Sequence, residues 1–166
     1  DKTLCSETEP GTPMEQAFCH LVRENAILQS LCLDYTVICF ADLKTDTIEV
    51  VKQGMFSHGM DIDEALPAKE KLSYRARMVY IRDHLLVKES CGDFYGELGP
   101  EGLMRHLMEK ETFTYRARTK GNREGNEYFE LKAIRVHQDE TSFKVVIGIR
   151  PIDDLIREEG RHQGRL

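Results

Sequence analysis

Tryptophan is absent from the 166-residue sequence, and so are the short motifs that mark common catalytic sites. There is no G-x-S-x-G nucleophile elbow, no G-K-S or G-K-T phosphate loop and no H-E-x-x-H zinc motif. Acidic side chains are plentiful, but in a chain with 31% charged residues they are expected on the solvated surface. The missing motifs predict that the chain is not itself an enzyme.

Basic residues are in the minority, and long apolar runs are missing. Lys and Arg number 23 against 29 Asp and Glu, which gives a net charge of -6. This balance argues against nucleic acid or an anionic membrane as the main partner. No run approaches the roughly 18 apolar residues of a membrane-spanning helix, and the start of the chain is too polar for a signal peptide. We therefore expect a cytoplasmic protein without direct membrane insertion.

Paired cysteine spacings are missing as well. The five cysteines form an odd set without a C-x-x-C pair, whereas zinc sites and disulfide frameworks usually show paired spacings. We expect free thiols in a reducing compartment and no metal site.

The composition that remains is that of one globular domain with extensions at its ends. Hydrophobic residues make up 40% of the sequence, which is enough for one core. Residues 1–12 are polar and lack periodicity, which predicts a disordered leader. Apolar residues at spacings of three, four and seven predict an amphipathic helix over 13–32. The domain itself is expected over 33–150, followed by an exit linker or signalling helix over 151–166.

Runs rich in β-branched and aromatic residues predict five strands. They are 35–43, 48–51, 112–119, 127–136 and 142–149. The first two are separated by a short polar turn and form a hairpin, and the last three form a meander. Between them the pattern predicts helices over 68–84 and 100–108. The expected fold class is α+β, with a five-stranded antiparallel sheet and helices on one face.

Basic residues alternate with other residues along the third predicted strand. Arg116, Arg118 and Lys120 lie at a period of two and therefore face one side of the sheet. Glu127 and Glu130 on the next strand can pair with them. This arrangement predicts cross-strand ion pairs on a solvated face; the alternative is a surface that accepts an anion or docks a partner.

Several segments along the chain carry recognisable local patterns. They are LDYTVICFADLKTD at 33–46, FTYR at 113–116, YFELKA at 128–133, VVIGI at 145–149 and IDD at 152–154. In this order and spacing they resemble the PAS domains of bacterial signalling proteins. The resemblance implies a PAS-like sensory domain that controls an attached diguanylate cyclase (GGDEF) or histidine kinase domain. Because the chain starts at Asp1 rather than Met, we expect an excised piece of a longer protein, with the output domain beyond Leu166.

The resemblance implies a small-molecule pocket between the sheet and the helical middle. The residues expected to line it are apolar or aromatic, some with polar tips, and they are Met55, Phe56, His58, Leu72, Tyr80, Tyr115, Phe129 and Ile147. A packed core without a cavity is the alternative. The C-x-x-C-H haem motif and the N-C-R-F context of flavin photosensors are both missing. No cofactor is therefore expected.

The two ends of the chain carry the remaining functional expectations. Phe18, Leu21 and Leu28 lie on the apolar stripe of the predicted first helix. They are candidates for the seam of a homodimer, and the alternative is that the stripe packs against the sheet of its own chain. Asp153 and Asp154 follow the last strand, where movement of the strand can reorient the next domain. Three functional hypotheses stay open: a ligand sensor, a ligand-free dimerisation module, and a small α+β enzyme or carrier with a cavity.

Overall fold

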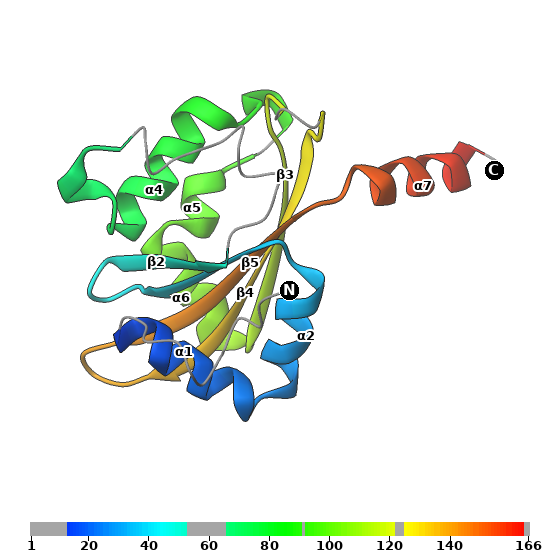
Figure 1. Cartoon of the computed structure of the whole chain (residues 1–166). Helices are drawn as coiled ribbons and strands as arrows, with labels where there is room; N and C mark the ends of the chain where they lie inside the picture. Colours follow the sequence, from blue (N-terminus) through cyan, green and yellow to red (C-terminus); the bar gives the residue numbers. More distant parts are fainter. Residues whose placement is uncertain (1–12, 53–65, 91, 122–124, 165–166) are drawn as a thin grey trace.

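A five-stranded antiparallel sheet forms the centre of the computed structural model, which describes residues 13–52, 66–90, 92–121 and 125–164. The strand order is β2-β1-β5-β4-β3. The strands are β1 (Val37–Asp42), β2 (Thr47–Lys52), β3 (Thr112–Arg118), β4 (Tyr128–Gln138) and β5 (Phe143–Pro151). The predicted α+β class, the five-stranded antiparallel sheet and its hairpin and meander are thereby confirmed (Figure 1).

The turn between β1 and β2 is held by two aspartates. Asp42 is 6% exposed, and its Oδ1 accepts hydrogen bonds from the backbone N–H groups of Lys44 and Phe143 at 3.0 Å each. Asp46 has a φ of 58° and accepts from the Ser73 hydroxyl at 2.7 Å. Carboxylates in these positions stabilise a tight turn without a bound ion. One aspartate joins β1 to β5, and the other joins the turn to the helical middle.

The helical middle covers one face of the sheet. Its elements are η2 (Ala68–Glu70), α4 (Tyr74–Tyr80), the π-helical turn η3 (Ile81–Leu85), η4 (Lys88–Ser90), α5 (Phe94–Leu98) and α6 (Pro100–Glu109). The predicted helix over 68–84 is therefore broken into several pieces, and α5 is an additional helix between the two that were predicted. Buried side chains from α4, α5 and α6 pack against alternate residues of the strands, such as Val37, Cys39 and Val145. This layer forms the larger of the two cores.

The N-terminal segment packs on the opposite face of the sheet. It forms two helices, α1 (Pro13–Arg23) and α2 (Ala26–Asp34), rather than the single helix predicted over 13–32. Phe18 and Leu28 are buried against Ile38 and Phe40 of β1. The expectation of helices on one face holds for the helical middle, and the N-terminal helices, which were expected separately, cover the other face. Period-two alternation of apolar residues on both sides of β1 requires cover on both faces.

The chain leaves the sheet through the C-terminal helix α7 (Asp153–Gly164), which extends away from the domain body (Figure 1). Ile152, just before it, is buried, whereas Asp154 and Leu155 are exposed. Among the described residues, no helix has the length and apolar character needed to cross a membrane. The predicted leader, 1–12, lies outside the described residues.

Candidate functional site

Three of the predicted pocket residues lie together on the face that the helical middle covers. Phe129 and Ile147 are 5% and 2% exposed and belong to the packed core. Tyr115 is half-buried beside that core. Its ring lies 5.8 Å from the ring of Phe94 on α5. All three residues therefore lie on the sheet face beneath the helical middle, within its packed core or beside it.

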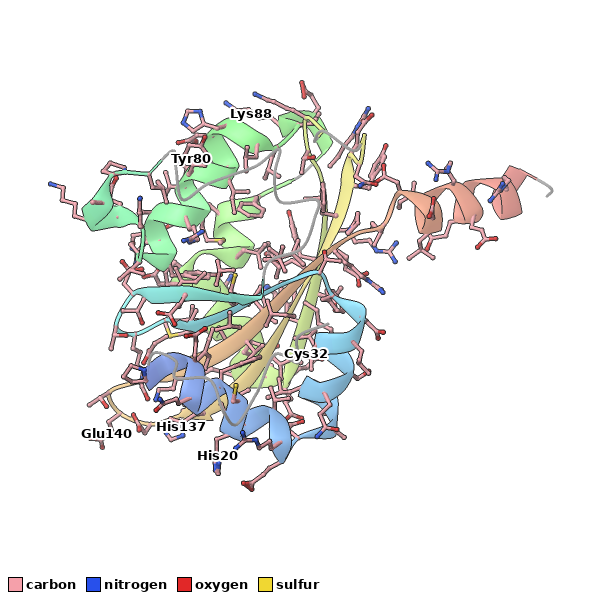
Figure 2. All side chains as sticks on the ribbon, in the orientation of Figure 1. His20, Cys32, Tyr80, Lys88, His137 and Glu140 are labelled. Carbon is pink, nitrogen blue, oxygen red and sulfur yellow. The ribbon has the colours of Figure 1, made fainter. Side chains whose placement is uncertain are left out.

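Two further predicted pocket residues, Leu72 and Tyr80, do not join that region. Leu72 is 61% exposed, and its carbonyl accepts a hydrogen bond from the Ile48 N–H at 2.9 Å. Tyr80 is half-buried at the end of α4, where its ring lies 4.6 Å from that of His84 (Figure 2 labels Tyr80). It lines an open surface cleft rather than the core. Met55, Phe56 and His58 lie outside the described residues.

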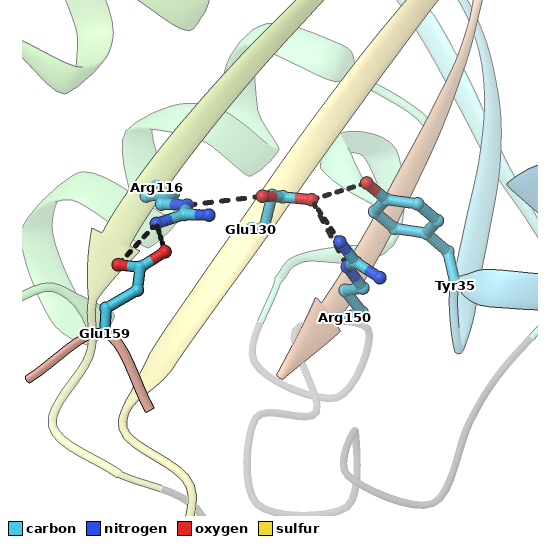
Figure 3. Close-up of polar contacts among 5 residues, drawn as sticks. All are labelled: Tyr35, Arg116, Glu130, Arg150 and Glu159. Carbon is cyan, nitrogen blue, oxygen red and sulfur yellow. Dashed lines mark hydrogen bonds and ion pairs between the residues drawn. The ribbon is translucent and has the colours of Figure 1, made fainter. Parts of the chain in front are cut away.

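A second region of interest lies on the opposite face of the sheet, where the chain enters and leaves the domain. Its centre is Glu130 on β4, a carboxylate that is only 6% exposed. Glu130 Oε2 accepts hydrogen bonds from the Tyr35 hydroxyl at 2.6 Å and from Arg150 Nη2 at 2.9 Å. Its Oε1 accepts from Arg116 Nε at 3.3 Å. We call Tyr35, Arg116, Glu130, Arg150 and Glu159 the exit network (Figure 3).

Each member of the exit network comes from a different element, and the register of the sheet explains how they meet. Arg116 and Arg150 are the direct cross-strand neighbours of Glu130, on β3 and β5 respectively. Side chains at opposed positions in an antiparallel pair lie on the same face. Tyr35 comes from the C-terminal cap of α2. The site therefore joins the N-terminal helices to three neighbouring strands.

The electrostatics of the exit network keep Glu130 ionised and Tyr35 neutral. Burial by itself raises the pKa of Glu130, but the hydrogen bonds from Tyr35 and Arg150 outweigh it and hold that pKa below its usual value. Burial, followed by the hydrogen bond to Glu130, raises the pKa of Tyr35 well above its usual value. The Arg150 guanidinium also lies over the Tyr35 ring, 4.7 Å from its centroid. The carboxylate is thus bound by two cations and one hydroxyl.

The exit network reaches the C-terminal helix through Arg116. Arg116 Nη1 lies 3.3 Å from Oε2 of Glu159, two turns into α7. Arg116 is therefore shared between a buried carboxylate on the sheet and an exposed carboxylate on the helix. Both ion pairs are drawn in Figure 3. Arg116 thereby couples the second turn of α7 to the sheet.

The two predicted exit residues, Asp153 and Asp154, play different parts. The carboxylate of Asp153 accepts hydrogen bonds from the backbone N–H groups of Glu127, at 3.0 Å, and of Tyr128, at 3.2 Å. It therefore fixes the first residue of α7 to the start of β4. Asp154 is exposed and pairs with Arg157 on the same helix. Asp153 is an anchor of the exit, whereas Asp154 only supports the helix.

The predicted dimer seam is occupied by contacts within the chain. Phe18 and Leu28 are 1% and 0% exposed, and Leu21 is half-buried against the same cluster. Their apolar surfaces are covered by the sheet. On α2, Ile27 and Leu33 are instead 43% and 85% exposed. A homodimer through this segment stays a prediction.

Sequence reasoning found part of the exit network and missed the rest. The alternation of Arg116 and Arg118 opposite Glu127 and Glu130 predicted the cross-strand ion pairs, which the structure confirms. The contribution of Tyr35 was missed because it depends on a contact between residues 95 positions apart.

In the described part of the chain, no group of three or more metal-ligating side chains converges.

No model of a known protein family matches the chain, and a search of curated proteins finds no match either.

Proposed function

We propose that this chain is a PAS-like regulatory domain of a bacterial signal-transduction protein. In this proposal it binds a small molecule between the sheet and the helical middle and controls an output domain, a diguanylate cyclase or a kinase, attached after α7. The hairpin, helical middle and three-strand meander support the proposal because this is the element order of the PAS resemblance. The regulatory role rests on one observation: Arg116 pairs with Glu130 on the sheet and also with Glu159 on α7.

Helix α7 is attached to the sheet by a firm contact at its first residue and by a weaker contact farther along. Asp153 fixes the first residue of α7 through two backbone N–H groups of β4. Farther along α7, Glu159 meets Arg116 at a surface where both side chains are nearly half exposed. Exposed ion pairs contribute about 0–1 kcal/mol, so this contact can break and reform at low cost. A small shift of β3 would therefore change the direction of α7 without unfolding the domain.

A ligand-free dimerisation module is the second hypothesis that a specific observation favours. Leu33 is 85% exposed on α2 and is therefore available for contact with a second chain. In this alternative the domain holds two parent chains together through α2, and the core carries no ligand. A small α+β enzyme or carrier is the third hypothesis, and it requires polar side chains that converge inside a cavity.

The Glu159 contact provides the test of the regulatory role. We expect Glu159→Gln to weaken the ion pair with Arg116 and to release α7 beyond its first turn. Glu158→Gln is the matched control, because Glu158 is a neighbouring exposed glutamate of the same helix. Backbone ¹⁵N relaxation measures the change as a lower order parameter for residues after Leu155.

The same pair of variants tests control of an output domain. The chain is fused through α7 to a diguanylate cyclase domain, and the rate of cyclic dinucleotide formation is measured. We expect Glu159→Gln to shift that rate and Glu158→Gln to leave it unchanged. Equal rates for the two variants, with α7 released only in the first, would rule out α7 as the route of control.

A further inference from the structure

A cleft of about 300 Å³ opens between the π-helical turn η3 and helix α5. We call it the π-turn cleft. The residues that line it and enter the argument are Arg82, Asp83, Leu86, Lys88, Phe94 and Tyr95. Its volume is at the lower end of the range of small-molecule sites, which is roughly 300–1,000 Å³. The cleft is separate from the exit network, which lies on the other face of the sheet.

The floor of the π-turn cleft is apolar and aromatic. Leu86 and Phe94 are each 5% exposed and belong to the main core. Tyr95 is held beside them, because its hydroxyl accepts a hydrogen bond from Arg75 at 2.8 Å. The Arg82 guanidinium lies 5.2 Å from the centroid of the Tyr95 ring. A flat hydrophobic group can therefore lie against a rigid floor.

The rim of the π-turn cleft carries the exposed cation Lys88, which acts electrostatically on Asp83 of the same rim without pairing with it directly. Arg82 is paired with Asp83 at 2.9 Å. The carboxylate of Asp93 accepts the Gly96 N–H at 3.0 Å, as the N-cap of α5. Lys88 is exposed at the surface of the helical layer (Figure 2 labels it), and in the described part of the chain no carboxylate pairs with it. The ammonium group of Lys88 is therefore accessible to the carboxylate of a ligand.

The wall of the π-turn cleft is joined directly to β3 by backbone hydrogen bonds. The Val87 N–H donates to the Arg118 carbonyl, and the Lys120 N–H donates to the Leu85 carbonyl, each at 2.9 Å. Leu86 forms an antiparallel bridge with Thr119. Any displacement of this wall is therefore transmitted to the strand that carries Arg116 on its opposite face.

We propose that the π-turn cleft binds a small aromatic carboxylate, with its ring on the floor formed by Leu86 and Phe94 and its carboxylate beside Lys88. Binding displaces segment 85–87, and β3 carries the displacement to Arg116 and α7. The proposed binding site is argued from the residues of the cleft alone, whereas its effect on α7 rests on the function proposed above. π-Helical turns are frequent at functional sites, which agrees with the position of η3 in the wall.

The probe for this site is 4-hydroxybenzoate, and the uncharged control ligand is 4-hydroxybenzamide. Both are titrated into the ¹⁵N-labelled chain while backbone amide shifts are followed. We expect saturable shifts at Leu86 and Phe94 with the acid, and weaker binding of the amide. Lys88→Gln should weaken acid binding about three- to tenfold, the range for loss of one charge-assisted contact. The matched control Lys110→Gln, an exposed lysine at the end of α6, should leave it unchanged.

Equal binding of acid and amide, shifts confined to other parts of the chain, or an unchanged affinity of Lys88→Gln would each overturn the site. Coupling is measured separately, as acid-induced shifts in α7 that disappear in Glu159→Gln while binding at Leu86 remains. Saturable binding without any shift in α7 would retain the site and overturn its coupling to the proposed function. Absence of binding combined with release of α7 in Glu159→Gln would overturn the site and retain the proposed function.

Discussion

Tyr35 and Glu130 make the shortest hydrogen bond of the exit network, at 2.6 Å between Oη and Oε2. The tyrosine follows α2, and the glutamate lies in the middle of the sheet on β4. A hydroxyl donor to an ionised and buried carboxylate is worth more than a neutral contact, because the acceptor has lost its hydration. At the residue scale, this bond holds the N-terminal helices to the polar end of the outer sheet face.

Removal of the Tyr35 hydroxyl tests how much its hydrogen bond to Glu130 stabilises the fold. We expect Tyr35→Phe to lower the free energy of unfolding by about 1 kcal/mol, because the ring keeps its packing while Glu130 loses one donor. Tyr128→Phe is the matched control, since in the described residues the Tyr128 ring has an arginine beside it and no hydrogen bond of its hydroxyl is seen. Urea unfolding at pH 7 measures both. An equal change in the two variants would contradict the role of the Tyr35 hydroxyl.

The pKa shifts in the network predict how this contribution depends on pH. The pKa of Glu130 is lowered on folding, so its stabilising effect is present above its usual value of 4.5 and is lost as the pH falls below it. The pKa of Tyr35 is raised on folding, so its effect is present below the usual value of 10.0 and is lost as the pH rises above it. The alkaline loss of stability should therefore be smaller in Tyr35→Phe, and part of it should remain because burial also raises the pKa of Tyr74.

At the scale of elements, the corner between α1 and α2, around Asn25, shows why the structure has two helices where the sequence predicts one. Asn25 has extended backbone angles, and its Oδ1 accepts from the N–H groups of Ile27 at 2.9 Å and Leu28 at 3.3 Å. Gln29 Nε2 in turn donates to the carbonyl of Val22 at 2.9 Å, at the end of α1. Both helix ends are therefore satisfied by side chains, and the apolar face can bend around the sheet.

The stability of the corner between α1 and α2 should depend on the side chain of Asn25. We expect Asn25→Ala to lower the free energy of unfolding by about 1 kcal/mol, as for loss of other N-caps, and Asn25→Asp to preserve it. Ser30→Ala, at an exposed position of α2, is the control and should change little. Urea unfolding of the three variants measures the difference. A continuous α1–α2 helix in Asn25→Ala, with undiminished stability, would show that the cap is not what separates the two helices.

At the scale of the whole molecule, the close approach of α2 to the sheet depends on a glycine. A Cβ added at Gly148 of β5 would lie 2.9 Å from Tyr35 Cγ and 3.0 Å from Leu31 Cδ1. Both neighbours are buried, so they have little room to move. The N-terminal layer and the exit network therefore share one tightly packed contact with the sheet.

This contact predicts different outcomes for two glycine substitutions. We expect Gly148→Ala to lower the free energy of unfolding by about 1–3 kcal/mol, because the methyl group overpacks the contact between α2 and the sheet. Gly160→Ala is the control: a Cβ there meets nothing within 4 Å, and a helical alanine is favoured over glycine by about 0.5–1 kcal/mol. Thermal unfolding distinguishes them, and equal effects would contradict the close packing at Gly148.

The sequence alone determined the strands, the hairpin, the meander and the cross-strand ion pairs of Arg116 and Arg118. These features are local: period-two patterning fixes which residues share a face, and polar turns fix where strands end. The turn after Asp42 also follows from the sequence, because an aspartate bonds nearby backbone N–H groups, here those of Lys44 and Thr45. The bond from the Arg75 N–H to Asp46 is instead a tertiary contact.

Only the tertiary structure decided which face of the sheet each helix covers and what the polar residues do there. The apolar stripe with Phe18 and Leu28 fits a partner chain or the chain's own sheet equally well, and the packing assigns it to the sheet. The exit network joins Tyr35 to Glu130 across 95 positions, and Arg116 to Glu159 across 43. Contacts over such separations depend on how the layers stack, which local patterns leave undetermined. The same stacking places the end of η3 against β3 and so forms the π-turn cleft.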